Sequence, residues 1–479
     1  MRTLTLLKLT AVAVAVLCSN GRAEDEFDRA PIEYRTSTPE NCISRLQNAL
    51  DAGERRLTYT GEHGYLVSLL AALNVPKESQ MLVYSKTSLQ LRRIAPRTPR
   101  AVYFNDSVYV GFCQSGDVLE ISAVDPQLGT VFYTLDQDPE EPPKFRRAID
   151  NCLICHSSSR TEGVPGHLVR SLFVDEGGQP MYSAGSRVVD HTTPLKDRWG
   201  GWYVTGTHGT ESHLGNLVIT TKDVPEPLNN SQGQNVVKLD DRFNVSRYLS
   251  PHSDIVALMI LEHQTLVHNR ITKANFATRQ ALHYEATMNK ALGYDEGTPL
   301  ESTARRIQSA GDDLVEALLM VGEAPITSPI SGTSGFAEKF SATGPFDSNG
   351  RSLRQLDFKT RMFQFPCSYL VYSEAFDGLP SRMKDYVWER IETILASEDT
   401  SEKYAHLSAA IRWAISEIPS RIQRPADWQL HQVQVSPRRL HRHSVKRTVH
   451  NAEETSAAFN PSRRGGNSVD RNHLPSGSG

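Results

Sequence analysis

The chain has 479 residues, of which 39% are hydrophobic and 22% charged, and it carries a formal net charge of -3 at pH 7. Such a composition is typical of a folded globular protein, and the length is enough for two or three domains, which excludes a disordered chain or a single small module. A net charge this close to zero gives no support to binding of nucleic acid or of an anionic membrane by the protein as a whole, so no nucleic-acid partner is expected.

The start of the chain has the pattern of a signal peptide, which we place at residues 1–23. Basic residues and a short apolar run, 9–17, precede the small residues at 21 and 23 where a signal peptidase would cut. A bilayer span needs about 20 apolar residues, so an uncleaved anchor is the less favoured alternative, and no later apolar run is longer than 255–261. We therefore expect a periplasmic or otherwise exported protein with no transmembrane span.

The next two regions differ in their hydrophobic periodicity. Residues 24–99 are predicted to be a helical N-terminal segment, because apolar residues recur there at helical spacing. Residues 100–250 are predicted to be β-rich and to start with an antiparallel meander, whose expected strands are 101–104, 108–112, 118–124 and 130–135. Further strands are expected at 167–174, 180–183, 202–205 and 214–220.

The pattern becomes helical again after residue 250. Within a helical region at 251–430 we expect helices at 253–279, 303–320, 381–395 and 401–418. The last segment, 431–479, is polar, basic and poor in large apolar residues, and it is predicted to be a disordered tail. The fold class is therefore predicted to be α+β, with an antiparallel β-rich N-terminal half and a mostly α-helical C-terminal half.

One short motif carries specific chemistry. Cys152, Cys155 and His156 form a C-x-x-C-H sequence within the β-rich region. Two thiols at this spacing reach the two vinyl groups on one edge of a porphyrin, and the adjacent histidine then lies under the iron as its proximal ligand. The motif therefore predicts one covalently bound haem c, and the expected export of the chain is the context in which such attachment takes place.

Three other interpretations of the motif are less favoured. A redox-active C-x-x-C would be expected in a thioredoxin-like βαβ unit, and no such pattern surrounds it. A zinc site would need a second pair of ligands at matching spacing, and the sequence contains no second C-x-x-C. Chance occurrence is the third alternative.

These residues resemble the haem-attachment site of c-type cytochromes, and the resemblance is specific over 151–156. The wider pattern, including NCLICHSSSRTEGVPG and RWGGWYVTGTHG, is similar to large exported bacterial proteins of cytochrome c-like sequence. The resemblance implies a haem protein and does not specify a substrate. In small class I cytochromes the motif opens an all-helical domain, whereas here strand-like sequence follows it, so a plain class I fold is not expected.

The sequence does not identify the sixth ligand of the iron. His208, between small residues in a Gly- and Trp-rich stretch, is the first candidate, and His263, in the long apolar helix, is the second. Met181 is a less favoured alternative, because a hairpin methionine is more often part of the packing. If none of them binds, the iron is five-coordinate and open to small molecules.

Three functions follow from these alternatives. The first is an exported mono-haem cytochrome that transfers electrons with a redox partner protein in the cell envelope. The second is a haem-dependent periplasmic oxidoreductase, such as a peroxidase or substrate oxidase, with an open iron site. The third is a haem-bearing binding or sensor protein. Of the remaining cysteines, Cys42, Cys113 and Cys367 allow at most one intramolecular disulfide, and the sequence does not show which pair would form it.

Overall fold

The computed structural model describes residues 25–421, all of which belong to one unit of the chain, 1–423. The predicted signal peptide, 1–23, and the predicted basic tail, 431–479, lie outside the described residues, and so does the end of the predicted helical region beyond residue 421.

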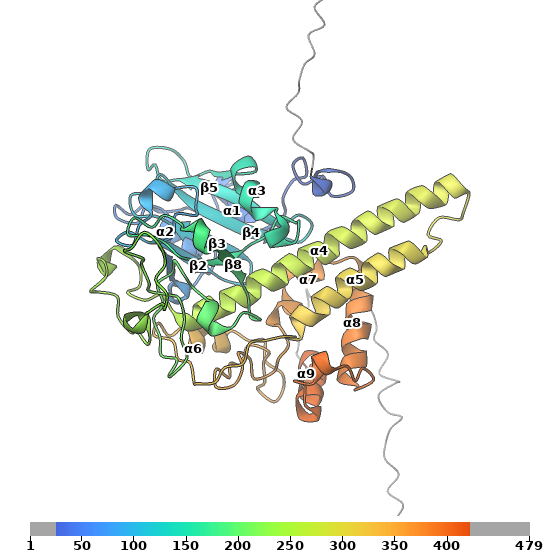
Figure 1. Ribbon diagram of the computed structural model, residues 1–479. Helices are drawn as coiled ribbons and strands as arrows, with labels where there is room; N and C mark the ends of the chain where they lie inside the picture. Colours follow the sequence, from blue (N-terminus) through green and yellow to red (C-terminus); the bar gives the residue numbers. More distant parts are fainter. Residues whose placement is uncertain (1–24, 422–479) are drawn as a thin grey trace, which may run out of the picture. The chain divides into compact units, whose positions relative to one another are not determined.

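A six-stranded antiparallel sheet forms the centre of the N-terminal half, and its strands follow one another in chain order as a meander (Figure 1). They are β1 (Met81–Val83), β2 (Arg100–Phe104), β3 (Val108–Phe112), β4 (Val118–Asp125), β5 (Gly129–Asp136) and β6 (Phe145–Arg147). The predicted meander is confirmed, with β1 and β6 added at its edges. Asn105 forms the turn between β2 and β3, because its side-chain oxygen accepts hydrogen bonds from the backbone N–H groups of Ser107 and Val108.

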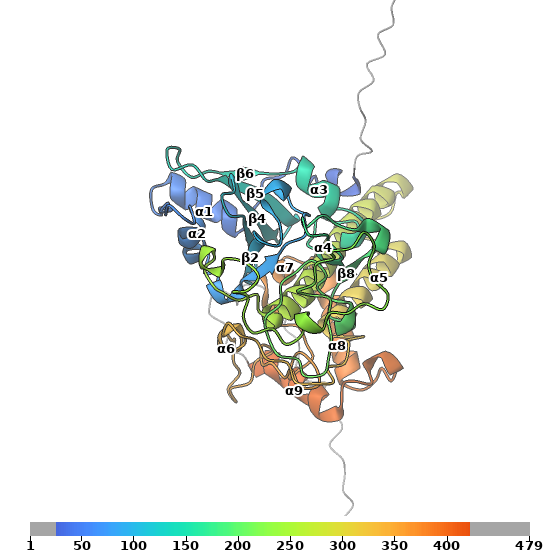
Figure 2. The same cartoon turned by 60° about the vertical axis from the view of Figure 1, so that its left-hand side comes forward.

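One face of the sheet is apolar. Val110, Ile121 and Tyr133 lie opposite one another on β3, β4 and β5, and they belong to a buried hydrophobic core. Helices α1 (Cys42–Asp51) and α2 (Leu66–Ala72) supply the other side of this core. Figure 2 shows both helices on the side of the sheet away from α4.

The other face of the sheet is partly polar. Tyr109, Ser122 and Phe132 are in register there, and their side chains alternate with those of the apolar core. Helix α3 (Asp150–His156), the segment that follows it, and helix α4 (Ile255–Leu292) contact this face through bonds described below. We call it the second face of the sheet.

The C-terminal half is helical, so the α+β class is confirmed. Its helices after α4 are α5 (Glu301–Leu318), α6 (Phe336–Ala342), α7 (Glu374–Asp377), α8 (Ser381–Leu395) and α9 (Ala409–Arg421). Asp254 caps the N-terminus of α4 through the N–H groups of Val256 and Ala257, and Gly293 ends the helix in the left-handed conformation that glycine adopts without strain. Helices α4 and α5 run side by side (Figure 1).

The region between the motif and α4 contains less regular strand than expected. A two-stranded ladder pairs β7 (Val169–Leu172) with β8 (Ser186–Val189), so the second strand of this hairpin lies further along the chain than the predicted 180–183. The strands predicted at 202–205 and 214–220 are wrong, because these segments form only isolated bridges, such as Val83 with Trp202.

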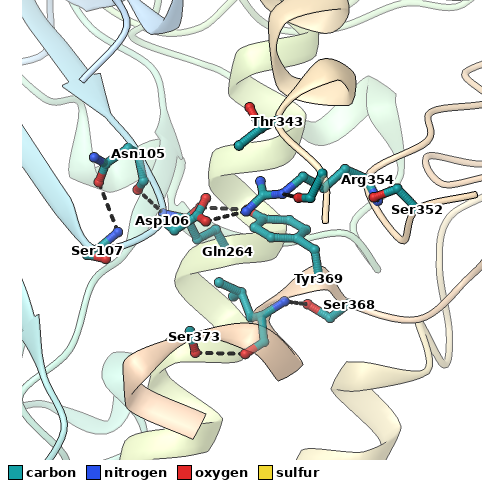
Figure 3. Close-up of polar contacts among 12 residues, drawn as sticks. Asn105, Asp106, Ser107, Gln264, Thr343, Ser352, Arg354, Ser368, Tyr369 and Ser373 are labelled. Atoms are coloured by element: carbon teal, nitrogen blue, oxygen red, sulfur yellow. Dashed lines mark hydrogen bonds and ion pairs between the residues drawn. The ribbon is translucent and has the colours of Figure 1, made fainter. Parts of the chain in front are cut away.

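A polar cluster joins the two halves of the protein, and Figure 3 shows it. Arg354 bonds to Asp106 in the β2–β3 turn, and its guanidinium lies over the ring of Tyr369, 4.3 Å from the ring centroid. The Tyr369 hydroxyl donates to Gln264 Oε1 of α4 at 2.6 Å. Gln264 Nε2 in turn donates to Tyr109 Oη at 2.8 Å, so this cluster reaches the second face of the sheet.

The described residues contain neither a membrane-spanning helix nor a disulfide. Within residues 25–421, none of the helices combines the length and apolar character that a membrane crossing requires. No disulfide joins any two cysteines in this part of the chain, Cys42, Cys113 and Cys367 included.

Candidate functional site

The C-x-x-C-H motif forms helix α3, directly after the edge strand β6. Leu153 is buried and anchors the helix on the core, and Cys152 packs partly buried against the same core. The other side of the helix faces outward, because Cys155 is exposed and Ile154 is 62% exposed. The two thiols, three positions apart, therefore lie at the boundary between the core and the surface.

The imidazole of His156 has a defined hydrogen-bonding state. Its Nδ1 lies 2.9 Å from the carbonyl oxygen of Gly166, and the N–H of Gly166 donates back to the His156 carbonyl oxygen at 2.8 Å. Because a carbonyl can only accept, Nδ1 must carry the proton, and Nε2 carries the lone pair. This hydrogen bond uses Nδ1 and leaves the lone pair of Nε2 on the other side of the ring.

The surroundings favour the uncharged form of this imidazole. Burial lowers the pKa of His156 and Arg100 adds to this effect through charge repulsion, against the opposing effects of the hydrogen bond to Gly166 and of Glu120. The ring packs against Phe132 of the second face, with 4.9 Å between the ring centroids. A neutral imidazole whose other nitrogen donates to a backbone carbonyl is the form in which histidine binds a metal.

A second histidine, His167, lies next to this arrangement and was not predicted from the sequence. Its ring is buried on the second face, 4.0 Å from the ring of Tyr109 between centroids, and hydrogen-bonds to Ser122 Oγ at 2.8 Å and to Thr130 Oγ1 at 3.1 Å. Both ring nitrogens are therefore engaged. The Gly-His pair ten residues after the motif was the signal that could have drawn attention to this loop.

The thiols do not have the properties of a redox-active pair. Burial, together with the charges of Glu120 and the neighbouring Cys155, raises the pKa of Cys152 to about 11. Reactive C-x-x-C thiols instead have a lowered pKa at the start of a helix in a βαβ unit. The two named sheets contain only antiparallel strand pairs, so α3 does not lie in the βαβ unit that a thioredoxin-like site requires.

No assembled metal-ligand cluster is present in the described part of the chain. Across residues 25–421, no three His, Cys, Asp or Glu side chains are grouped so that they could hold a metal ion.

The first predicted sixth ligand, His208, contacts Asn235 and His213. It is buried, and its Nε2 accepts a hydrogen bond from the N–H of Asn235 at 3.0 Å. Among residues 25–421, no hydrogen bond or ring contact joins it to the motif.

The second predicted ligand, His263, lies inside α4 with both ring nitrogens engaged. Its Nδ1 is 3.2 Å from Nδ1 of His191, and its Nε2 is 2.8 Å from Ser368 Oγ. Met181, the less favoured alternative, is half-buried between β7 and β8, where its N–H donates to Phe173. The structure thus brings Cys152, Cys155 and His156 together on α3. The identity of a sixth ligand stays a prediction.

Comparison of the chain with protein-family models, with curated proteins and with solved structures finds no match. The functional assignment therefore depends on the residues of α3 and their surroundings.

Proposed function

We propose that this chain is an exported c-type haem protein that transfers electrons with a redox partner protein in the cell envelope. One haem would be attached through thioethers to Cys152 and Cys155, and His156 would bind the iron through Nε2. The observation that supports this most directly is the hydrogen bond from His156 Nδ1 to the Gly166 carbonyl, which leaves the lone pair on Nε2, in the residue that follows the exposed Cys155.

The residues around the motif fit such a group. A bound haem would supply an iron that takes up and releases one electron, with a potential that depends on its ligands and on its exposure to water. The chain's own residues would hold and orient it: the thiols at the surface boundary anchor the porphyrin edge, and Gly166 and Phe132 fix the plane of the imidazole. Ile154, exposed beside the thiols, offers apolar surface to a porphyrin.

Covalent attachment is the first prediction. When the exported protein is denatured and extracted with acidified acetone, the haem is expected to stay with the polypeptide, because thioether bonds survive this treatment. Replacing both motif cysteines, Cys152→Ser and Cys155→Ser, is expected to abolish the retained haem. Cys42→Ser serves as the matched control, since Cys42 is half-buried like Cys152 but lies outside the motif. An exported wild-type protein without haem, or haem lost on extraction, contradicts the proposal.

A second candidate function is favoured by one observation. Both histidines predicted as sixth ligands are held by other groups, His208 by Asn235 and His263 by His191 and Ser368. An iron bound by His156 alone would be open to small molecules, as in a haem-dependent oxidoreductase.

Carbon monoxide separates the two functions. A shift in the spectrum of the reduced protein on addition of carbon monoxide indicates an open iron and supports the oxidoreductase. An unchanged spectrum indicates a bound sixth ligand and supports electron transfer. In that case His208→Ala, and then His263→Ala, identify the ligand as the variant in which carbon monoxide begins to bind.

A further inference from the structure

The loop that contacts His156 is held by a side chain from the helical half of the protein. Asn269, on α4, accepts a hydrogen bond at Oδ1 from the N–H of His167 at 2.9 Å and donates one from Nδ2 to the His167 carbonyl at 2.7 Å. One buried amide, 5% exposed, thus pairs with both peptide groups of a single residue 102 positions away in the chain.

Gly166, the residue before His167, connects the loop to the motif by hydrogen bonds. Its N–H and its carbonyl both bond to His156, to the carbonyl oxygen and to Nδ1 respectively. A Cβ at this position would lie 2.3 Å from Asn269 Oδ1 and 2.9 Å from its Cγ, so only glycine lets the asparagine approach the loop this closely. The contacts therefore run without a break from Asn269 through His167 and Gly166 to the imidazole.

The sheet holds the same loop from the opposite side. The N–H of Thr130 donates to the Pro165 carbonyl at 3.1 Å, and the His167 ring bonds to Ser122 and Thr130. The loop is thereby fixed between β5 and α4. On the α4 side, Arg270 and Lys273 form ion pairs with Glu162 earlier in the loop, and Asn269 supplies the contact to His167. Removal of its amide would leave the buried N–H and carbonyl of His167 without this partner.

We propose that Asn269 is a positioning residue for the His156 imidazole. By pairing with both peptide groups of His167, it keeps the Gly166 carbonyl in line with Nδ1, so that the proton stays on Nδ1 and the lone pair on Nε2. The use of that lone pair by an iron rests on the proposed function, whereas the positioning itself does not.

The test measures the tautomer of His156 in the full chain, produced in the cytoplasm with isotope-labelled histidine so that no haem is attached. Nitrogen chemical shifts at neutral pH give the ratio of Nδ1–H to Nε2–H forms. In Asn269→Leu this ratio is expected to fall about tenfold, which corresponds to about 1.4 kcal/mol and is the size of one hydrogen bond. Gly166→Ala, which displaces the asparagine from the other side, is expected to act in the same direction.

Asn275→Leu is the matched control. Asn275 is as deeply buried on the same helix, and its Nδ2 donates to the carbonyls of Pro126 and Gly378 instead of the loop. Its loss is expected to lower stability and to leave the tautomer ratio of His156 unchanged. Equal falls in the ratio for Asn275→Leu and Asn269→Leu would show general loosening and overturn the positioning role.

Two further variants keep the proposal testable if Asn269→Leu does not fold. Asn269→Asp keeps the acceptor for the His167 N–H and places a second oxygen against the His167 carbonyl, so it is also expected to lower the ratio. A folded Asn269→Asp and a folded Gly166→Ala that both keep the wild-type ratio would overturn the proposal.

Failure of this inference and failure of the proposed function are distinguishable. If the tautomer responds as expected but the exported protein carries no haem, Asn269 positions His156 for another purpose and the haem proposal is wrong. If the haem is retained but the tautomer does not respond, the haem proposal stands and the role of Asn269 is wrong.

Discussion

Replacing Glu262 with glutamine is expected to lower the free energy of unfolding by about 3–5 kcal/mol, because it leaves a buried guanidinium without its counter-charge. Glu262 lies on α4 and is fully buried, and Arg198, with 2% of its side chain exposed, donates to its Oε2 at 2.7 Å. Trp199 Nε1 donates to Oε1 at 2.5 Å. The substitution keeps the shape of the side chain and removes its charge. The loss of stability therefore measures the cost of burying Arg198 without a counter-charge.

Urea denaturation at pH 8 is the measurement. Burial raises the pKa of Glu262 to about 7 against the opposing effect of Arg198, so at pH 8 the carboxylate is mostly charged. The matched control is Glu374→Gln, which breaks an exposed pair with Arg45 at 3.0 Å. Both side chains of that pair are more than half exposed, and the expected loss is under about 1 kcal/mol. Similar losses in the two variants would contradict a dominant role for the buried pair.

Stability is expected to fall by several kcal/mol as the pH drops from about 6.5 to about 4, because buried histidines resist protonation. Burial is the chief cause of a lowered pKa in seven histidines of the described part of the chain, and five of them have the larger shifts. The pKa falls to about 4 in His191 and His268, to about 3 in His213, and well below its usual value in His167 and His263. The unfolded chain binds protons on these histidines below pH 6.5, where the folded chain does not. For His191 and His268, the fall of the pKa from 6.5 to about 4 is equivalent to about 3–4 kcal/mol each.

Two buried carboxyl groups have the opposite effect on stability as the pH falls. Burial raises the pKa of Glu262 and of Glu323 to about 7, so the folded protein takes up protons on them between about pH 7 and 4.5, and this uptake stabilises it. The histidines are more numerous, and the net effect is expected to be a loss.

Urea denaturation between pH 8 and pH 4 checks this expectation. His268→Gln, which removes one buried imidazole beside Tyr109, should make the dependence shallower. A wild-type protein whose stability stays level or rises over this interval would show that the carboxyls outweigh the histidines.

Much of the fold could be predicted from local pattern. Helix α8 was predicted at its observed bounds, Ser381–Leu395, and four strands of the meander were predicted within about two residues, because periodic apolar residues and turn-forming residues act over short distances. The segments 202–205 and 214–220 have strand-like composition but find no continuous ladder partner. A strand requires such a partner, and local composition does not indicate whether a distant segment supplies it.

The site divides in the same way. The sequence by itself determined Cys152, Cys155 and His156 as a set, since their chemistry depends on spacing along one helix of seven residues. The tertiary structure alone decided which nitrogen of His156 is free, because the Gly166 carbonyl that fixes the proton is held in place by Asn269 of α4. A contact between residues 102 positions apart depends on how the sheet and the helix pack together, and no periodicity in the sequence records that packing.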